Sequence, residues 1–223
     1  MSDDRLRYAL QHFFSEKFTY ETNLPVYELE ETAPEGKSRL TVDVGASESI
    51  CVANYDDQKK FPKWGILNSA RRFHLTACID HFILRKNSAD NWELHMFEMK
   101  RSVGSDTWWN IKYKMRSSYL SIKAIAVYLG IDLDDSNITA YTTFKKEKWN
   151  PSEMTAPVIV VPKIGERAVD VKKAEWDTGF IEIPMIISDT NFHECLNFIK
   201  LRHKKIQMKP SSDDEVLEGR MRL

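Results

Sequence analysis

The chain has 223 residues, of which 42% are hydrophobic and 29% are charged, a composition ordinary for one well-packed globular domain. The formal net charge of −1 excludes a general polyanion-binding surface, so any contact with nucleic acid would depend on local basic patches. No run approaches the roughly 18 apolar residues that a membrane span needs. Because Cys51, Cys78 and Cys195 are far apart and odd in number, they fit reduced thiols. We expect a cytoplasmic protein with no membrane partner.

The first half of the chain begins with a predicted helix. Apolar residues recur at helical spacing over residues 3–17, behind acidic residues that suit a helix N-terminus. Residues 24–31 and 38–44 are predicted to be short strands, and residues 54–65 a loop. The helix should cover one face of a sheet.

Two apolar runs follow in the centre of the chain. Residues 72–85 and 92–100 read as buried strands, and the polar segment 86–91 that joins them has the composition of a tight turn. We expect these runs to pair as adjacent antiparallel strands.

The second half is predicted to be mixed. Apolar positions alternate four and three residues apart over 107–129, with Gly130 as a C-terminal cap, which predicts a long helix. The remaining predictions are strands at 138–144, near 157–161 and at 179–187, a helix at 190–205, and a solvated tail from residue 209.

Three charged residues lie in the two central runs. Side chains alternate between the faces of a strand, so Glu98 and Lys100 share one face, and Asp80 can meet them from the neighbouring strand. Two buried carboxylates repel each other unless a cation lies between them, and oxygen ligands of this kind suit Mg²⁺ or Mn²⁺. The pattern indicates a metal-dependent phosphodiesterase, in which Lys100 would either orient the metal-bound water or stabilise charge in the transition state.

The order of these elements resembles the PD-(D/E)XK nuclease superfamily, whose fold is restriction-endonuclease-like. Asp80 stands at the first acidic position, Glu98-Met99-Lys100 matches the Glu-x-Lys motif, and a helix and a strand follow. Ile79 occupies the position of the family's proline, and Met115, four residues before Tyr119, replaces the glutamine that some branches carry. The resemblance covers about residues 66–144. It implies catalysis by Asp80, Glu98 and Lys100 and favours DNA as the substrate, with RNA as the open alternative.

Several assignments stay open at this stage. An upstream acidic ligand could be Glu48, Asp56 or Asp57. Lys112, Arg116 and Tyr119 form a column along one border of the helix and are candidates for substrate binding, although basic side chains at such a border also commonly just cover the edge of a core.

Other readings of the central strands remain as well. Cys78 shares a predicted strand face with Asp80, which raises the alternative of a thiol nucleophile, against the simpler reading of a buried thiol. Asp80 and Lys100 could also form a cross-strand ion pair with no catalytic role.

We therefore expect an α/β protein with a central mixed β-sheet flanked by helices and a restriction-endonuclease-like core. Residues 1–208 would form one nuclease-like domain, with residues 145–208 as a C-terminal extension, and residues 209–223 would be a flexible tail. Asp80, Glu98 and the Met99 carbonyl would bind Mg²⁺ or Mn²⁺.

The competing hypothesis is a non-catalytic module that binds nucleic acid or protein on the same fold. Cutting both strands of a duplex would favour a homodimer, and a larger defence or mobile-element complex is a further hypothesis.

Overall fold

The computed structural model describes residues 3–14, 16, 18–32, 37–57, 77–149, 171–184, 198–212 and 216–223. The helices are α1 (Asp3–His12), α2 (Ser105–Tyr128) and α3 (Val171–Asp177), with a short 3-10 turn, η2 (Asp135–Asn137). The strands are β1 (Glu21–Thr22), β2 (Val26–Glu31), β3 (Ser38–Asp43), β4 (Ser49–Val52), β5 (His81–Lys86), β6 (Trp92–Met99), β7 (Ser102–Val103), β8 (Ile138–Phe144), β9 (Lys146–Glu147), β10 (Phe180–Pro184), β11 (Phe198–Gln207), β12 (Lys209–Pro210) and β13 (Leu217–Arg222).

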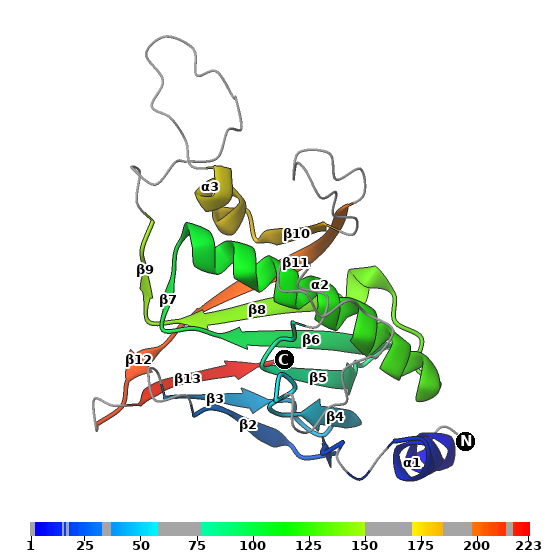
Figure 1. Ribbon diagram of the computed structural model, residues 1–223. Helices are drawn as coiled ribbons and strands as arrows, with labels where there is room; N and C mark the ends of the chain where they lie inside the picture. Colours follow the sequence, from blue (N-terminus) through cyan, green and yellow to red (C-terminus); the bar gives the residue numbers. More distant parts are fainter. Residues whose placement is uncertain are drawn as a thin grey trace.

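A mixed sheet of seven strands forms the centre of the protein, in the order β1-β4-β5-β6-β8-β11-β10. The central strands β6 and β8 are parallel, as are β8 and β11, whereas β5 and β6 are antiparallel. Parallel neighbours need a long crossover connection, and α2 supplies it between β6 and β8 (Figure 1). The expected α/β class with a central mixed sheet is confirmed.

The two faces of this sheet carry two separate cores. One face packs against α1 and α2, through residues such as Phe82 and Met96 on the sheet and Ile111 on α2. The other face packs Ile83 and Phe97 against a second sheet of order β12-β13-β3-β2. Alternation along β5 and β6 therefore separates a helix-facing side from a sheet-facing side. A third sheet pairs β7 with β9.

Several predicted elements are present. The hairpin between β5 and β6 is closed by Asn87, whose Oδ1 accepts hydrogen bonds from the N–H groups of Ala89 and Asn91. The predicted strand at 138–144 is β8, and α2 ends before Gly130, which has a φ of 71°. The strand predicted near 157–161 lies outside the described residues.

The helix predicted at 190–205 is wrong from residue 198 onward. Those residues form β11, in which Leu201 and His203 are buried while Lys200, Arg202 and Lys204 are exposed, a period of two rather than 3.6. β11 pairs with β8 on one side and with β10 on the other. Residues 190–197 lie outside the described residues.

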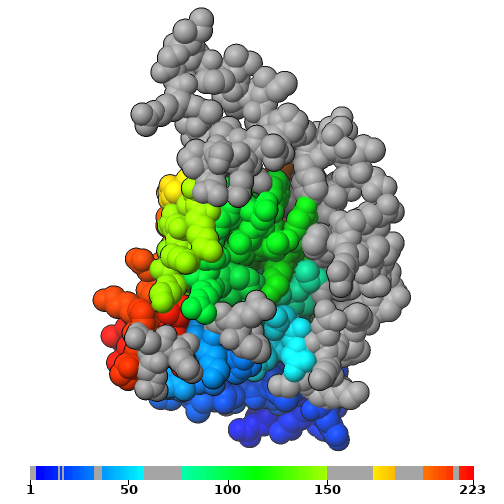
Figure 2. Space-filling model, turned by 60° about the vertical axis from the view of Figure 1, so that its left-hand side comes forward, coloured from blue at the N-terminus to red at the C-terminus, as the bar shows by residue number. Residues whose placement is uncertain are grey.

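The flexible tail predicted for residues 209–223 is also corrected by the structure. Residues 217–222 form β13, which pairs in parallel with β3 and antiparallel with β12. In Figure 2 the red and orange C-terminal strands lie against blue residues from the start of the chain. The polar composition of this segment suggested solvation, but backbone pairing and the burial of Leu217 hold it in the second sheet.

Among the described residues, the structure shows no helix that is both long enough and apolar enough to cross a membrane. Cys51 and Cys78 do not form disulfides, whereas Cys195 lies outside the described part of the chain.

Candidate metal centre

Asp80 stands directly before β5 and is almost fully buried. The strand register pairs His81 with Phe97, so Asp80 lies opposite Glu98 one step further along the hairpin. Its Oδ2 accepts a hydrogen bond of 2.6 Å from the N–H of Met99. On the other side, the N–H of Ile79 donates to Ser118 Oγ on α2 at 2.9 Å. Backbone contacts to β6 and α2 therefore fix the position of this carboxylate.

Glu98 and Lys100 share the helix-facing side of β6, as their spacing predicted. Glu98 is fully buried, and its Oε1 lies 2.5 Å from Lys100 Nζ. The same ammonium group lies 3.8 Å from Asp80 Oδ2 and donates to the Met99 carbonyl at 2.9 Å. The structure therefore brings together all the residues that the sequence named as catalytic or metal-binding.

A second lysine enters this cluster from α2. Lys114 Nζ lies 3.0 Å from Asp80 Oδ1 and 2.9 Å from Glu98 Oε1, so it bridges the two carboxylates. Lys114 is not among the site residues predicted from the sequence, because the predicted column lies along the border of the helix that carries Lys112 and Arg116. Lys114 lies on the opposite border, four residues before Ser118. The available signal in the sequence was Ser118, a polar residue in the otherwise apolar stripe, because Lys114 lies four residues before it and so on the same side of the helix.

Asp56 is the acidic residue upstream of the motif that approaches the site. Its Oδ2 lies 3.7 Å from Lys114 Nζ. The preceding residue fixes this segment, because the N–H of Tyr55 donates to the Asp80 carbonyl at 2.6 Å. Of the other candidates, Glu48 lies 3.4 Å from Lys86 Nζ at the hairpin, and the N–H of Asp57 donates to the Asn54 carbonyl in a turn.

Burial and mutual repulsion separate the protonation behaviour of the three carboxyl groups. Burial raises the pKa of Glu98 to about 7, and the charge of Asp80 adds to this shift. Burial also raises the pKa of Asp56 to about 6, again with a contribution from Asp80. Although burial alone would raise the pKa of Asp80, Lys100 and Lys114 together lower it. Asp80 is therefore the strongest acid of the three, and its negative charge is held by two ammonium groups.

The donor set of the site fits a hard divalent cation. It consists of carboxylate oxygens and a backbone carbonyl, which are the ligands that Mg²⁺ and Mn²⁺ prefer. In the described part of the chain, Glu98 Oε2 is buried without a hydrogen-bond partner, so it has the capacity for one more ligand. The carboxylates are buried, whereas the side chains of Lys100 and Lys114 are 28% and 24% exposed, so the site meets solvent at its lysines.

The same oxygens do not form a preorganised metal-binding site. The described residues contain no group of three or more His, Cys, Asp or Glu side chains placed to hold a metal ion. Ammonium groups contact both Asp80 and Glu98 instead. Binding a divalent ion would therefore require these contacts to rearrange.

The residues predicted to bind substrate do not converge on this site. Lys112 forms an ion pair of 2.9 Å with Glu175 of α3. Arg116 is buried, with its guanidinium 5.5 Å from the centre of the Tyr113 ring. Tyr119 donates a hydrogen bond of 2.7 Å to Asp135 in η2. The contacts of Lys112 and Tyr119 join α2 to α3 and η2, and Arg116 packs against Tyr113 of α2 itself, so these three side chains do not form a basic column at the site.

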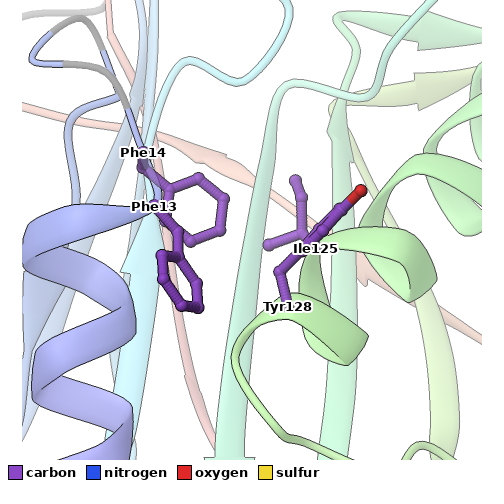
Figure 3. A pocket seen from close by; sticks show the side chains of 4 residues that line it. All are labelled: Phe13, Phe14, Ile125 and Tyr128. Atoms are coloured by element: carbon purple, nitrogen blue, oxygen red, sulfur yellow. The ribbon is translucent and has the colours of Figure 1, made fainter.

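Two other places in the structure, the Cys78 thiol and a surface pocket between α1 and α2, do not offer the acid, base or metal-ligand groups of this site. Burial, with the charge of Asp56, raises the pKa of the Cys78 thiol to about 11, which disfavours a thiolate nucleophile. A surface pocket of about 460 Å³ lies elsewhere, where Phe13 and Phe14 at the end of α1 face Ile125 and Tyr128 of α2 (Figure 3). Its four lining residues are apolar except for the Tyr128 hydroxyl and include no acid, base or metal ligand.

Comparisons with protein-family models, with curated proteins and with solved structures gave no match to this chain.

Proposed function

We propose that this protein is a metal-dependent nuclease that hydrolyses phosphodiester bonds, with DNA as the substrate class implied by the motif. The observation that carries the proposal is the meeting of Asp80, Glu98 and Lys100 at the end of the β5–β6 hairpin, on the face covered by α2. The order β5, β6, α2, β8, with β6 and β8 parallel, is also the order of the restriction-endonuclease-like core that the motif implies. This order supports membership of the superfamily.

Asp80, Glu98 and the carbonyl of Met99 would hold Mg²⁺ or Mn²⁺. When bound, such an ion polarises a phosphoryl oxygen and lowers the pKa of its water. Lys100 would place its ammonium beside the phosphate, because Met99 and Glu98 already hold it at the solvent edge of the site. In that position it would stabilise negative charge that develops on the phosphoryl oxygens. The thiols Cys51 and Cys78 fit a cytoplasmic setting.

One observation favours the competing hypothesis of a non-catalytic binding module. Lys100 and Lys114 already neutralise much of the charge on Asp80 and Glu98, as an ion-pair network with a structural role would do. In that case the carboxylates would bind no metal, and their loss would change stability alone.

The test is cleavage of supercoiled plasmid, linear duplex, single-stranded DNA and RNA in the presence of Mg²⁺, Mn²⁺ or EDTA. We expect metal-dependent cleavage that falls at least about 100-fold in Lys100→Ala and in Asp80→Asn. Lys123→Ala is the matched control, since Lys123 is on α2 but pairs with Asp135. Circular dichroism would establish that each variant is folded. Absence of cleavage of every substrate by the folded wild type would rule against the nuclease.

A further inference from the structure

Lys114 occupies the position between the two carboxylates that a shared ligand would occupy. Its Nζ contacts Asp80 Oδ1 at 3.0 Å and Glu98 Oε1 at 2.9 Å, one oxygen from each residue. Lys100 is placed differently, since it lies close to Glu98 and the Met99 carbonyl but 3.8 Å from Asp80. The ammonium of Lys114 is therefore the bridging cation of the site.

An ammonium group and a divalent ion cannot both occupy the position between Asp80 and Glu98. Both need direct contact with the lone pairs of Asp80 and Glu98, and they repel each other strongly at such short separation. We propose that Lys114 is a built-in competitor of the divalent ion, so that metal binding requires its ammonium to leave the carboxylates. This inference rests on the proposed function, because it concerns how the same site takes up its ion.

The balance of formal charge favours replacement of the Lys114 ammonium by the divalent ion over binding of the ion beside both lysines. With Asp56, Asp80 and Glu98 ionised, three carboxylates face two ammonium groups, which leaves one negative charge. Replacement of the Lys114 ammonium by a divalent ion would bring the site to neutrality, whereas adding the ion beside both lysines would leave a positive charge among buried groups. Buried groups tolerate uncompensated charge poorly.

The surroundings of Lys114 allow it to leave. Its side chain is 24% exposed and belongs to a helix, so the long stem can turn outward without a change in the backbone. Asp56, which is 39% exposed, lies 3.7 Å from its Nζ on the more exposed side of the cluster. Asp56 is therefore the most exposed of the three carboxylates that the ammonium would leave.

The first test measures Mn²⁺ affinity of the full chain by electron paramagnetic resonance of free Mn²⁺. We expect Lys114→Met to bind Mn²⁺ about 10- to 100-fold more tightly than wild type, since it removes one positive charge from a partly exposed site. Lys114→Arg, which keeps the charge, and Lys123→Met, which lies away from the site on the same helix, should both match wild type. Equal or weaker Mn²⁺ binding by Lys114→Met, with clear binding by wild type, overturns the inference and leaves the nuclease proposal standing.

The second test uses the wild-type chain and so does not depend on how the variants fold. Reductive methylation read by mass spectrometry reports the reactivity of each lysine amine. Saturating Mg²⁺ should raise the labelling rate of Lys114 and leave that of Lys123 unchanged. An unchanged rate at Lys114, in protein shown to bind the ion, overturns the competition. Failure of wild type and of Lys114→Met to bind any Mn²⁺ would instead remove the metal site, and the proposed function with it.

Discussion

Asp80 joins two kinds of contact that differ in how they respond to substitution. One carboxylate oxygen accepts the N–H of Met99, a buried backbone donor, and the other contacts the ammonium of Lys114. An asparagine can keep the first contact through its amide oxygen, but it cannot keep the charge. A leucine can keep neither.

We therefore expect Asp80→Leu to lower the free energy of unfolding by about 3 kcal/mol, because it leaves a buried N–H and two ammonium groups without this acceptor. Asp80→Asn should cost less. Urea denaturation checks both, with Asp135→Asn, which breaks an exposed ion pair with Lys123, as a control expected to change stability by less than about 1 kcal/mol. Equal losses for the leucine and asparagine variants would contradict the role given to the Met99 hydrogen bond.

At the scale of single residues, the sequence predicted the part of the site that depends on strand alternation. Asp80, Glu98 and Lys100 meet because a hairpin with period-two side chains permits little else. Lys114 was not predictable with the same ease, since an amphipathic helix has two borders. The tertiary hydrogen bond from the Ile79 N–H to Ser118 on α2 places one of these borders beside Asp80. Asp56 depends on a tertiary contact, the hydrogen bond from Tyr55 to the Asp80 carbonyl.

At the scale of elements, β11 brings a histidine into the core beneath α2. His203 is buried beside Trp108 and Trp176, and its Nε2 lies 3.0 Å from Thr142 Oγ1 on β8. Burial lowers the pKa of His203 to about 3, and the charge of Lys205 adds to this shift. The ring is therefore neutral in the folded protein over most of the acidic range.

This gives a pH dependence with a defined sign. The unfolded chain binds a proton at His203 near pH 6.5 and the folded chain only near pH 3, so stability from this group is complete above pH 6.5 and falls as pH decreases toward 3. Between pH 7 and pH 5 we expect wild type to lose about 2 kcal/mol more than His203→Gln does. Urea denaturation at each pH checks this, with His12→Gln, an exposed site on α1, as the control. Parallel pH profiles for wild type and His203→Gln would contradict it.

The elements that the sequence predicted well are those with a strong, local period. The β5–β6 hairpin, α2 and β8 all follow from apolar spacing and turn residues within a few positions. The prediction of a helix at 190–205 rests on the capping residues Ser188, Asp189 and Thr190 and not on the period of the residues that form β11. Its alternation of exposed Lys200, Arg202 and Lys204 with buried Leu201 and His203 becomes decisive only once β8 and β10 flank it.

At the scale of the whole molecule, β13 is an internal strand of the second sheet and not a dispensable end. Leu217 is 5% exposed and belongs to the same core as Leu40 and Val42 of β3. We expect Leu217→Ala to lower the free energy of unfolding by about 2–4 kcal/mol. Glu218→Ala, at the next and exposed position, should change it by less than about 0.5 kcal/mol. Thermal and urea denaturation measure both, and a neutral Leu217→Ala would restore the prediction of a solvated tail.

The pairing of β3 with β13 also has a consequence for how the protein is made. Residues 38–43 bind residues 217–222, so β3 leaves the ribosome long before its parallel partner exists. During that interval one edge of β3 lacks the hydrogen bonds and the apolar cover that β13 later gives it, and unpaired strand edges of this kind favour association between chains. Yield of folded protein during synthesis should therefore depend on how quickly the last strand arrives, and on whether a chaperone covers β3 until it does.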